Sequence, residues 1–182
     1  MIVVSAILGF TQKTLPIKDV TLINTEYVYG EYGHELIMAN GNGYLTANNR
    51  GLLILNLDDV DNPTIIGNYT VKGAQGLVIQ GNIVYFMAYQ AGLVILNTSN
   101  PSQPQLIANY TKFASNTFAI DGNMIFTINY TSKNLLCLDA TNLKNITIKG
   151  SEYLTQYSSD MQIITQNHMI YRDWETDRKS VV

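Results

Sequence analysis

One motif recurs along this chain at a nearly constant interval and limits the folds that the chain can adopt. Its clearest copies are GLLILN at Gly51–Asn56 and GLVILN at Gly92–Asn97, which lie 41 residues apart. Pro63 and Pro104 follow at the same interval, and Gly-Asn pairs starting at residues 41, 81 and 122 keep steps of 40 and 41. A period of about 40 to 45 residues built from short apolar segments is typical of a propeller blade and not of a helical solenoid.

The copy between residues 76 and 111 predicts four short strands, at 76–80, 83–89, 93–96 and 105–111. In the second segment Val84, Phe86 and Ala88 alternate with apolar neighbours, which places the two sets on opposite faces. Residues 93–96 form a continuous apolar run that is too short and too β-branched for a helix, which favours a strand covered on both faces. The fourth segment follows Pro104, as expected of an edge strand. Four strands with the last at an edge make a blade.

The same pattern extends in both directions along the chain. The preceding copy predicts strands at 37–40, 43–47, 52–55 and 64–70, and the following copy predicts strands at 118–121, 124–129, 135–138 and 146–153. Residues 20–27 resemble the last strand of an earlier blade, and 161–165 and 168–171 resemble the first two strands of a later one. The sequence therefore predicts an all-β propeller fragment, with about three full four-stranded blades and partial blades at both ends.

The two ends of the chain differ from the repeats. Residues 1–19 open with an apolar MIVVSAILGF segment, and we expect either the remnant of a secretion signal or part of an incomplete blade. Residues 20–171 carry the predicted blades. Residues 172–182 gather charge that the rest avoids, and their DRKSVV ending resembles the translation of a sequencing-library adapter. We expect this tail to be non-native, with a natural charged tail as the alternative.

The repeat resembles the LVIVD-repeat family, whose units carry a Gly-Leu-Val-Ile-Val-Asp third strand followed by an Asn-Pro turn. The resemblance covers about residues 33–150 and is strongest in the two central copies. Asn56 and Asn97 replace the usual aspartate of the motif, and Asp139 keeps it. The resemblance implies a β-propeller of the kind found in surface or exported proteins, without a general enzymatic activity.

Composition excludes several classes of function. The formal net charge is -3 and no Lys/Arg cluster precedes the last dozen residues, so the chain lacks the basic patch of a nucleic-acid-binding protein. Cys137 is the single cysteine, which excludes an intrachain disulfide, and its apolar neighbours predict a buried structural thiol. No apolar run reaches 18 residues, so we expect no transmembrane helix. We expect no cofactor.

Candidate binding residues are expected in loops, because the strands are used for packing. The predicted loops join blades at 29–35, 72–75 and 112–116, and join second to third strands at 48–50, 89–90 and 130–133. The candidate ligand-binding residues in these loops are His34, Glu35, Arg50, Tyr89, Gln90 and Lys133. His34 and Glu35 form the pair with the most chemical capacity, as a base or ligand set, and an ordinary loop histidine is the alternative.

Acidic residues and glycosylation motifs add little specific signal. Asp58, Asp59 and Asp61 precede Pro63, which indicates turn chemistry, with calcium binding as the alternative. We expect no metal site. Five sequons, of which about three would arise by chance, agree with export and glycosylation. They lie at Asn68, Asn97, Asn109, Asn129 and Asn145.

Two functions from different classes remain. The first is a non-enzymatic extracellular or cell-surface module that binds or scaffolds a protein or glycan partner through loops held by rigid blades. The alternative is a hydrolase or lyase whose active site lies at the mouth of the propeller channel and is completed by missing blades. A third possibility is a propeller that acts only as a spacer.

Overall fold

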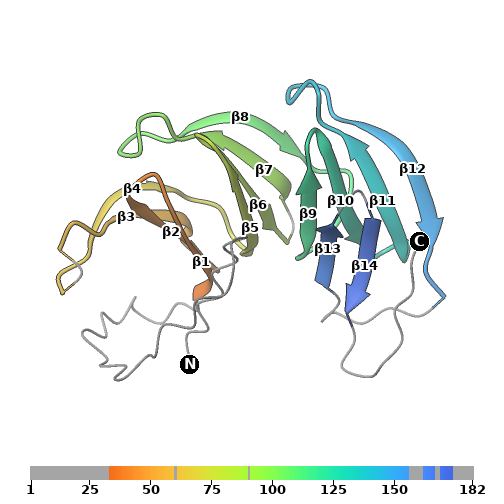
Figure 1. Ribbon diagram of the computed structural model, residues 1–182, viewed down its shortest axis with the longest axis horizontal. Coiled ribbons are helices and arrows are strands. Elements are labelled where there is room, and N and C mark those ends of the chain that lie inside the picture. Colours follow the sequence, from red (N-terminus) through yellow and green to blue (C-terminus); the bar gives the residue numbers. More distant parts are fainter. Residues whose placement is uncertain (1–32, 60, 90, 156–161, 167–168, 174–182) are drawn as a thin grey trace.

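The computed structural model describes residues 33–59, 61–89, 91–155, 162–166 and 169–173 (Figure 1). In this part of the chain every regular element is a strand. In chain order they are β1 (Gly33–Ala39), β2 (Asn42–Ala47), β3 (Gly51–Asn56), β4 (Thr64–Tyr69), β5 (Ala74–Gln80), β6 (Ile83–Ala88), β7 (Gly92–Asn97), β8 (Gln105–Tyr110), β9 (Phe118–Asp121), β10 (Met124–Asn129), β11 (Asn134–Asp139), β12 (Thr147–Tyr153), β13 (Gln162–Gln166) and β14 (Met169–Asp173).

The strands form three antiparallel four-stranded sheets and one hairpin, and each sheet follows chain order. The first sheet is β1 to β4, the second is β5 to β8, the third is β9 to β12, and β13 pairs with β14. Figure 1 shows the sheets side by side in an open arc, with β4, β8 and β12 along its outer rim. β13 lies against β9 as β5 lies against β1, so the hairpin begins a further blade. The predicted propeller fragment is confirmed; the earlier strand predicted at 20–27 lies outside the described residues.

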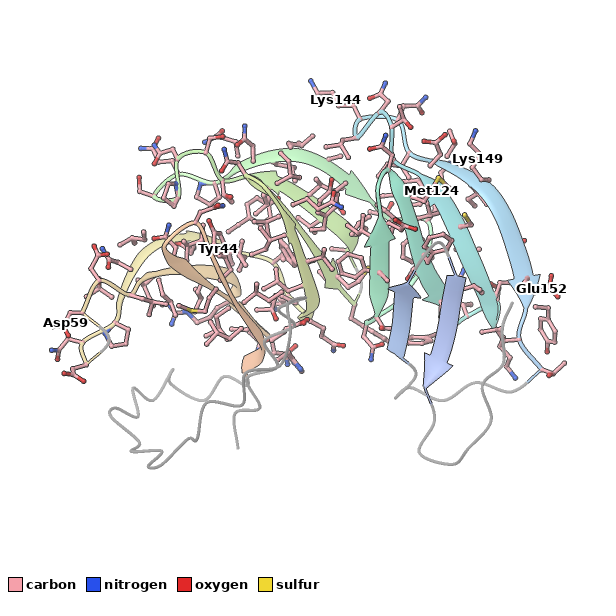
Figure 2. All side chains as sticks on the ribbon, in the orientation of Figure 1. Tyr44, Asp59, Met124, Lys144, Lys149 and Glu152 are labelled. Carbon is pink, nitrogen blue, oxygen red and sulfur yellow. The ribbon has the colours of Figure 1, made fainter. Side chains whose placement is uncertain are left out.

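The second sheet is buried on both faces, because side chains alternate along its two central strands. Val84 and Phe86 of β6 belong to the apolar cluster between the first and second sheets. Tyr85 and Met87, their neighbours on the same strand, belong to the cluster between the second and third sheets. Tyr44, labelled in Figure 2, completes the first cluster from the side of β2. The middle blade therefore supplies apolar surface to both neighbours, as the unbroken apolar run at 93–96 predicted.

Each outer strand carries an irregularity at the same place. The pairing of β4 with β3 shifts in register opposite Ile54 and Leu55 of β3. The pairings of β8 with β7 and of β12 with β11 shift at the equivalent positions. The extra residues are Ile66, Ile107 and Lys149. A bulge increases local twist and interrupts the free hydrogen-bonding edge of an outer strand. The three blades thus protect their exposed edges in the same way.

Two successive side-chain turns follow the third strand of every blade. In the first turn the side-chain oxygen of Asn56, Asn97 or Asp139 accepts the N–H two residues later, at 2.7, 2.8 and 2.9 Å. In the second turn the acceptors are Asp59, Asn100 and Asn142, and the donors are Asp61, Ser102 and Lys144. An amide and a carboxylate both offer this acceptor oxygen, which explains why Asn can stand where the motif has Asp. Figure 2 shows Asp59 and Lys144 in equivalent turns of the first and third sheets.

Asp139 differs from its two counterparts in being charged, and this predicts a pH effect. Hydrogen bonds from Thr141 and the nearby Lys149 ammonium, with Nζ 3.1 Å from Oδ2, lower the pKa of Asp139 to about 2. A depressed carboxyl pKa stabilises the fold above the ordinary carboxyl range, and that stabilisation is lost as the pH falls towards 2.

Replacing Asp139 with Asn keeps the acceptor oxygen but removes the charge that pairs with Lys149, so the urea midpoint at pH 7 should fall slightly, and its decline below pH 4 should become shallower than in the wild type. Asp139→Ala removes the acceptor and should lower the midpoint further at every pH. Urea titrations from pH 2 to 7 measure both effects. Equal midpoints for the two variants at pH 7 would show that the turn does not depend on this oxygen.

The first strands of the blades begin earlier than predicted. β1 starts at Gly33 and β5 at Ala74, where the sequence predicted 37 and 76. Both strands change register near their start, between Gly33 and Glu35 and between Ala74 and Leu77. A bulge breaks the alternation of side chains from which a strand is predicted. The sequence therefore predicted only the regular part of each strand, after the bulge. His34 and Glu35 therefore lie on β1, and the loop predicted to end at residue 35 was placed too far along the chain.

The first hairpin also corrects the predicted repeat interval. Asn40 has a φ of 51°, close to the 58° of Gly81 and the 57° of Gly122. These three residues open the two-residue turns between the first and second strands. Asn40 and not Gly41 is therefore the counterpart of Gly81, which makes the first step 41 residues instead of 40. Asn tolerates the left-handed backbone that usually requires Gly. The sequence alone therefore did not reveal that Asn40 is equivalent to Gly81.

Candidate functional site

The turns between second and third strands meet the linkers between sheets at one end of the blades, which we call the loop end. Gly73, in the first linker, donates its N–H to Asn48 O at 2.5 Å and accepts from Tyr89 N at 2.9 Å. In the next linker Ala114 O accepts from Tyr130 N at 3.0 Å. Each linker is therefore held by backbone hydrogen bonds to a neighbouring turn.

An open cavity of about 420 Å³ lies at the loop end, between the second and third sheets. It is formed by the turn after β6, the linker after β8, and the end of β10 with the residues that follow. Its lining residues are Tyr89, Thr111, Lys112, Phe113, Ala114, Asn129 and Thr131. The Phe113 ring is buried in the apolar cluster between these sheets, whereas the side chain of Tyr89 is 53% exposed. The cavity thus joins an apolar base to polar and aromatic groups that solvent can reach.

Lys112 is the one formally charged residue among the described residues of this lining. Its Nζ lies 5.6 Å from the centre of the Tyr110 ring, within the range of a cation–π interaction. Tyr110 in turn packs against Phe113, with ring centres 5.7 Å apart. The Tyr110 hydroxyl is buried without a hydrogen-bond partner, and burial raises its pKa. Lys112 therefore lies over the ring of Tyr110, which itself packs on the cavity residue Phe113.

Of the candidate binding residues, Tyr89 alone among those described lines this cavity. Arg50 is half-buried in the turn between β2 and β3, where its N–H bonds Ala47 O at 3.1 Å. Lys133 is exposed in the turn between β10 and β11, with a φ of 58°. His34 is exposed on β1, and Gln90 lies outside the described residues. The sequence did not single out Lys112, Phe113 or Thr131, although residues 112–116 were predicted as a loop.

Glu35 bridges the first two sheets. Its Oε2 accepts a hydrogen bond from Leu77 N of β5 at 2.6 Å. Desolvation raises the pKa of this carboxyl, and the hydrogen bond from Leu77 acts in the opposite direction. In the second sheet Gly76 stands at the corresponding place, where the linker carbonyl of Asn116 approaches closely. A side chain of the size of Glu35 would therefore not fit at this place in the second sheet.

Among the described residues, no three His, Cys, Asp or Glu side chains gather as ligands for a metal ion. Asp59 accepts hydrogen bonds from Asp61 N and from Asn62 Nδ2, which confirms the turn interpretation.

Cys137 is half-buried, where full burial was predicted, and desolvation and the Asp139 charge raise its pKa. The described residues also contain no helix long and apolar enough to cross a membrane.

The five sequons differ in exposure. Asn68 and Asn109 are exposed at equivalent positions of the outer strands β4 and β8, and Asn145 is exposed before β12. Asn97 and Asn129 are half-buried, and each accepts a backbone N–H two residues later. The outer rim therefore offers the more accessible asparagine side chains.

Comparison with known protein families identifies the repeat unit that forms the second sheet. Residues 73–112 match the family model of the LVIVD repeat. This chain carries an LVIVD repeat. The match spans β5 to β8, so one LVIVD repeat corresponds to one four-stranded blade, and its signature GLVILN is β7. The LVIVD repeat family is associated with β-propeller structure, in agreement with the arc of sheets.

Solved structures show the same fold at low sequence identity. A putative 6-phosphogluconolactonase from Bacteroides uniformis matches with a TM-score of 0.61 and 12% identity, covering 78% of this chain and 47% of that one. The computationally designed Ika4 protein matches with a TM-score of 0.60 and 9% identity, covering 90% and 98%. The N-terminal domain of Nup159 matches with a TM-score of 0.51 and 9% identity, covering 82% and 43%. The chain therefore spans about half the length of the first structure. No curated protein matches it.

Proposed function

We propose that this LVIVD-repeat chain is part of a β-propeller that serves as an extracellular or cell-surface binding or scaffold module. The open cavity at the loop end carries the proposal, because it gathers aromatic, amide, hydroxyl and ammonium groups from two neighbouring blades. The central strands of the second blade are buried on both faces, and only Ile83 and Asn97 at their ends are partly exposed. The partner, a protein or a glycan, would be held by loop residues on this rigid support.

The chemistry of the cavity favours binding over catalysis. General acid and base catalysis needs titratable groups positioned at one reacting centre. Among the described residues, the lining offers Lys112 and Tyr89 but no carboxylate or histidine. Glu35, which with His34 forms the candidate base or ligand set, is hydrogen-bonded to the backbone of Leu77 in the neighbouring sheet. The exposed sequon residues Asn68 and Asn109 support an extracytoplasmic location.

Arrays of purified glycans and extracellular proteins, probed with the full chain, test the proposal. The single substitutions Arg50→Ala, Tyr89→Ala and Lys133→Ala remove side chains at the loop end. At least one of them is expected to weaken binding to the spots that the wild type recognises by about tenfold, since truncating an important contact costs roughly 1–2 kcal/mol.

Ser102→Ala and Gln103→Ala are matched controls, because both residues are exposed in the turn between β7 and β8. These two variants should bind as the wild type does. No signal from the wild type, or a signal that all three loop-end substitutions leave unchanged, would contradict the proposal and favour a spacer.

A further inference from the structure

We propose that the cavity between the second and third blades binds a carboxylated saccharide, with one sugar ring against Tyr89 and its carboxylate at Lys112. This inference rests on the proposed function and names the ligand class of its site. A cavity of about 420 Å³ is within the size range of small-molecule sites. Because the cavity is open, it can hold one unit of a longer glycan while the rest extends into solvent.

The charge of the cavity selects for an anion. Among the described residues that line it, Lys112 carries the single formal charge, in a chain whose net charge is -3. Among the described residues, no carboxylate lies within ion-pair distance of its ammonium. The ring of Tyr110 keeps Nζ near the linker without neutralising it. One ammonium without a guanidinium suits a single carboxylate better than a phosphate, which proteins commonly bind with Arg forks or several donors.

The uncharged lining suits a sugar ring. A pyranose presents C–H groups on one face and hydroxyls around its edge. The half-exposed Tyr89 ring offers a flat amphipathic surface for the C–H face. Asn129 uses its side-chain oxygen to accept from Thr131 N at 3.1 Å, which leaves the amide donors for sugar hydroxyls. The Thr131 hydroxyl adds a group that can both donate and accept.

The cavity is also held in shape before any ligand arrives. The turn that carries Tyr89 is hydrogen-bonded through its backbone to Gly73, and Tyr130, between Asn129 and Thr131, is bonded in the same way to Ala114. Sites fixed in advance lose less entropy on binding. Of the three segments that form the cavity, the linker at Ala114 and the end of β10 are therefore joined to each other, and the turn at Tyr89 is anchored to the preceding linker.

A matched pair of ligands tests the inference. Methyl β-glucuronide and methyl β-glucoside differ only in the carboxylate, and the affinity of each for the full chain is measured by calorimetry or NMR titration. The chain is produced in bacteria so that Asn129 carries no glycan. The glucuronide should bind about three- to fivefold more tightly, as expected for one partly exposed ion pair, and the difference should shrink in high salt.

Variants separate the roles of the two key side chains. Lys112→Gln should abolish the preference for the glucuronide, and Lys112→Glu should reverse it. Tyr89→Ala should weaken the binding of both glycosides. Lys144→Gln removes an exposed lysine in the turn between β11 and β12, outside the cavity, and should change neither affinity. Lys112 and Tyr89 are exposed, and unchanged thermal unfolding would confirm that each variant folds.

Three results would overturn the inference: equal affinity for the two glycosides, no binding of either, or capture of acidic peptides at Lys112 without glucuronide binding. If one of these occurs while loop-end substitutions still abolish recognition on the arrays, only the ligand class is wrong. If the arrays also give no signal that depends on the loop end, the proposed function fails as well.

Discussion

Replacing Gly92 with alanine is expected to lower the free energy of unfolding by about 2–5 kcal/mol. Gly92 begins β7 with a φ of 75°, in the left-handed region that costs other residues about 1–2 kcal/mol. A Cβ at this position would also overlap the carbonyl oxygen of Tyr110. Moving a backbone group inside the closely packed second sheet should add about 1–3 kcal/mol. Glycine is therefore required at the first position of the GLVILN motif for two reasons: a side chain would not fit there, and the backbone has a positive φ.

Gly41→Ala is the matched control for this change. Gly41 has a φ of 76°, but nothing lies within 4 Å of its added Cβ. Its replacement should cost only the conformational part, about 1–2 kcal/mol. Urea unfolding of the full chain, followed by far-UV circular dichroism, measures both variants. Equal losses would mean that the overlap with Tyr110 is relieved at no cost and that the close packing at Gly92 is overstated.

Gly67→Ala is expected to lower the free energy of unfolding by about 2–3 kcal/mol, for a reason that involves two blades. Gly67 is buried on the outer strand β4. An added Cβ would overlap the carbonyl oxygen of Pro101, in the turn between β7 and β8. The substitution should therefore push the first and second sheets apart at the outer rim. Calorimetric or urea unfolding should show the lower stability directly.

Gly150 supplies an internal comparison for Gly67. It follows the bulge of β12 just as Gly67 follows the bulge of β4. Nothing lies within 4 Å of a Cβ added at Gly150. Gly150→Ala should be neutral or stabilising by about 0.5–1 kcal/mol, because alanine loses less backbone entropy on folding. If both alanine variants change stability alike, the contact between blades at Pro101 does not contribute as described.

Much of the fold could be predicted because its signals are local. Alternation along residues 83–89 and the unbroken apolar run at 93–96 predicted the two-sided burial of the second sheet, and the strands of all three blades were found close to their observed bounds. The errors arose where local patterns are interrupted. Bulges hid the start of β1 and β5, and the left-handed Asn40 shifted the first repeat interval by one residue.

The cavity could not be predicted from sequence in the same way. Its lining comes from three segments around Tyr89, Lys112 and Thr131, which become neighbours only when adjacent blades pack. No spacing within one repeat records that packing. Glu35 shows the same limit, because its bond to Leu77 depends on how the first and second sheets meet. Sequence periodicity thus defines the blade, whereas contacts between blades define the candidate site.

Native-state hydrogen exchange of the full chain tests the blade arrangement most directly. The amides of β6 and β7 lie in the centre of a sheet that is buried on both faces, whereas every residue of β12 is exposed. Because exchange from a protected core requires larger opening than exchange from an outer strand, segments 83–88 and 92–97 should exchange at least about a hundredfold more slowly than segment 147–153. Equal rates, or faster exchange in β6 and β7 than in β12, would contradict a middle blade packed between two neighbours.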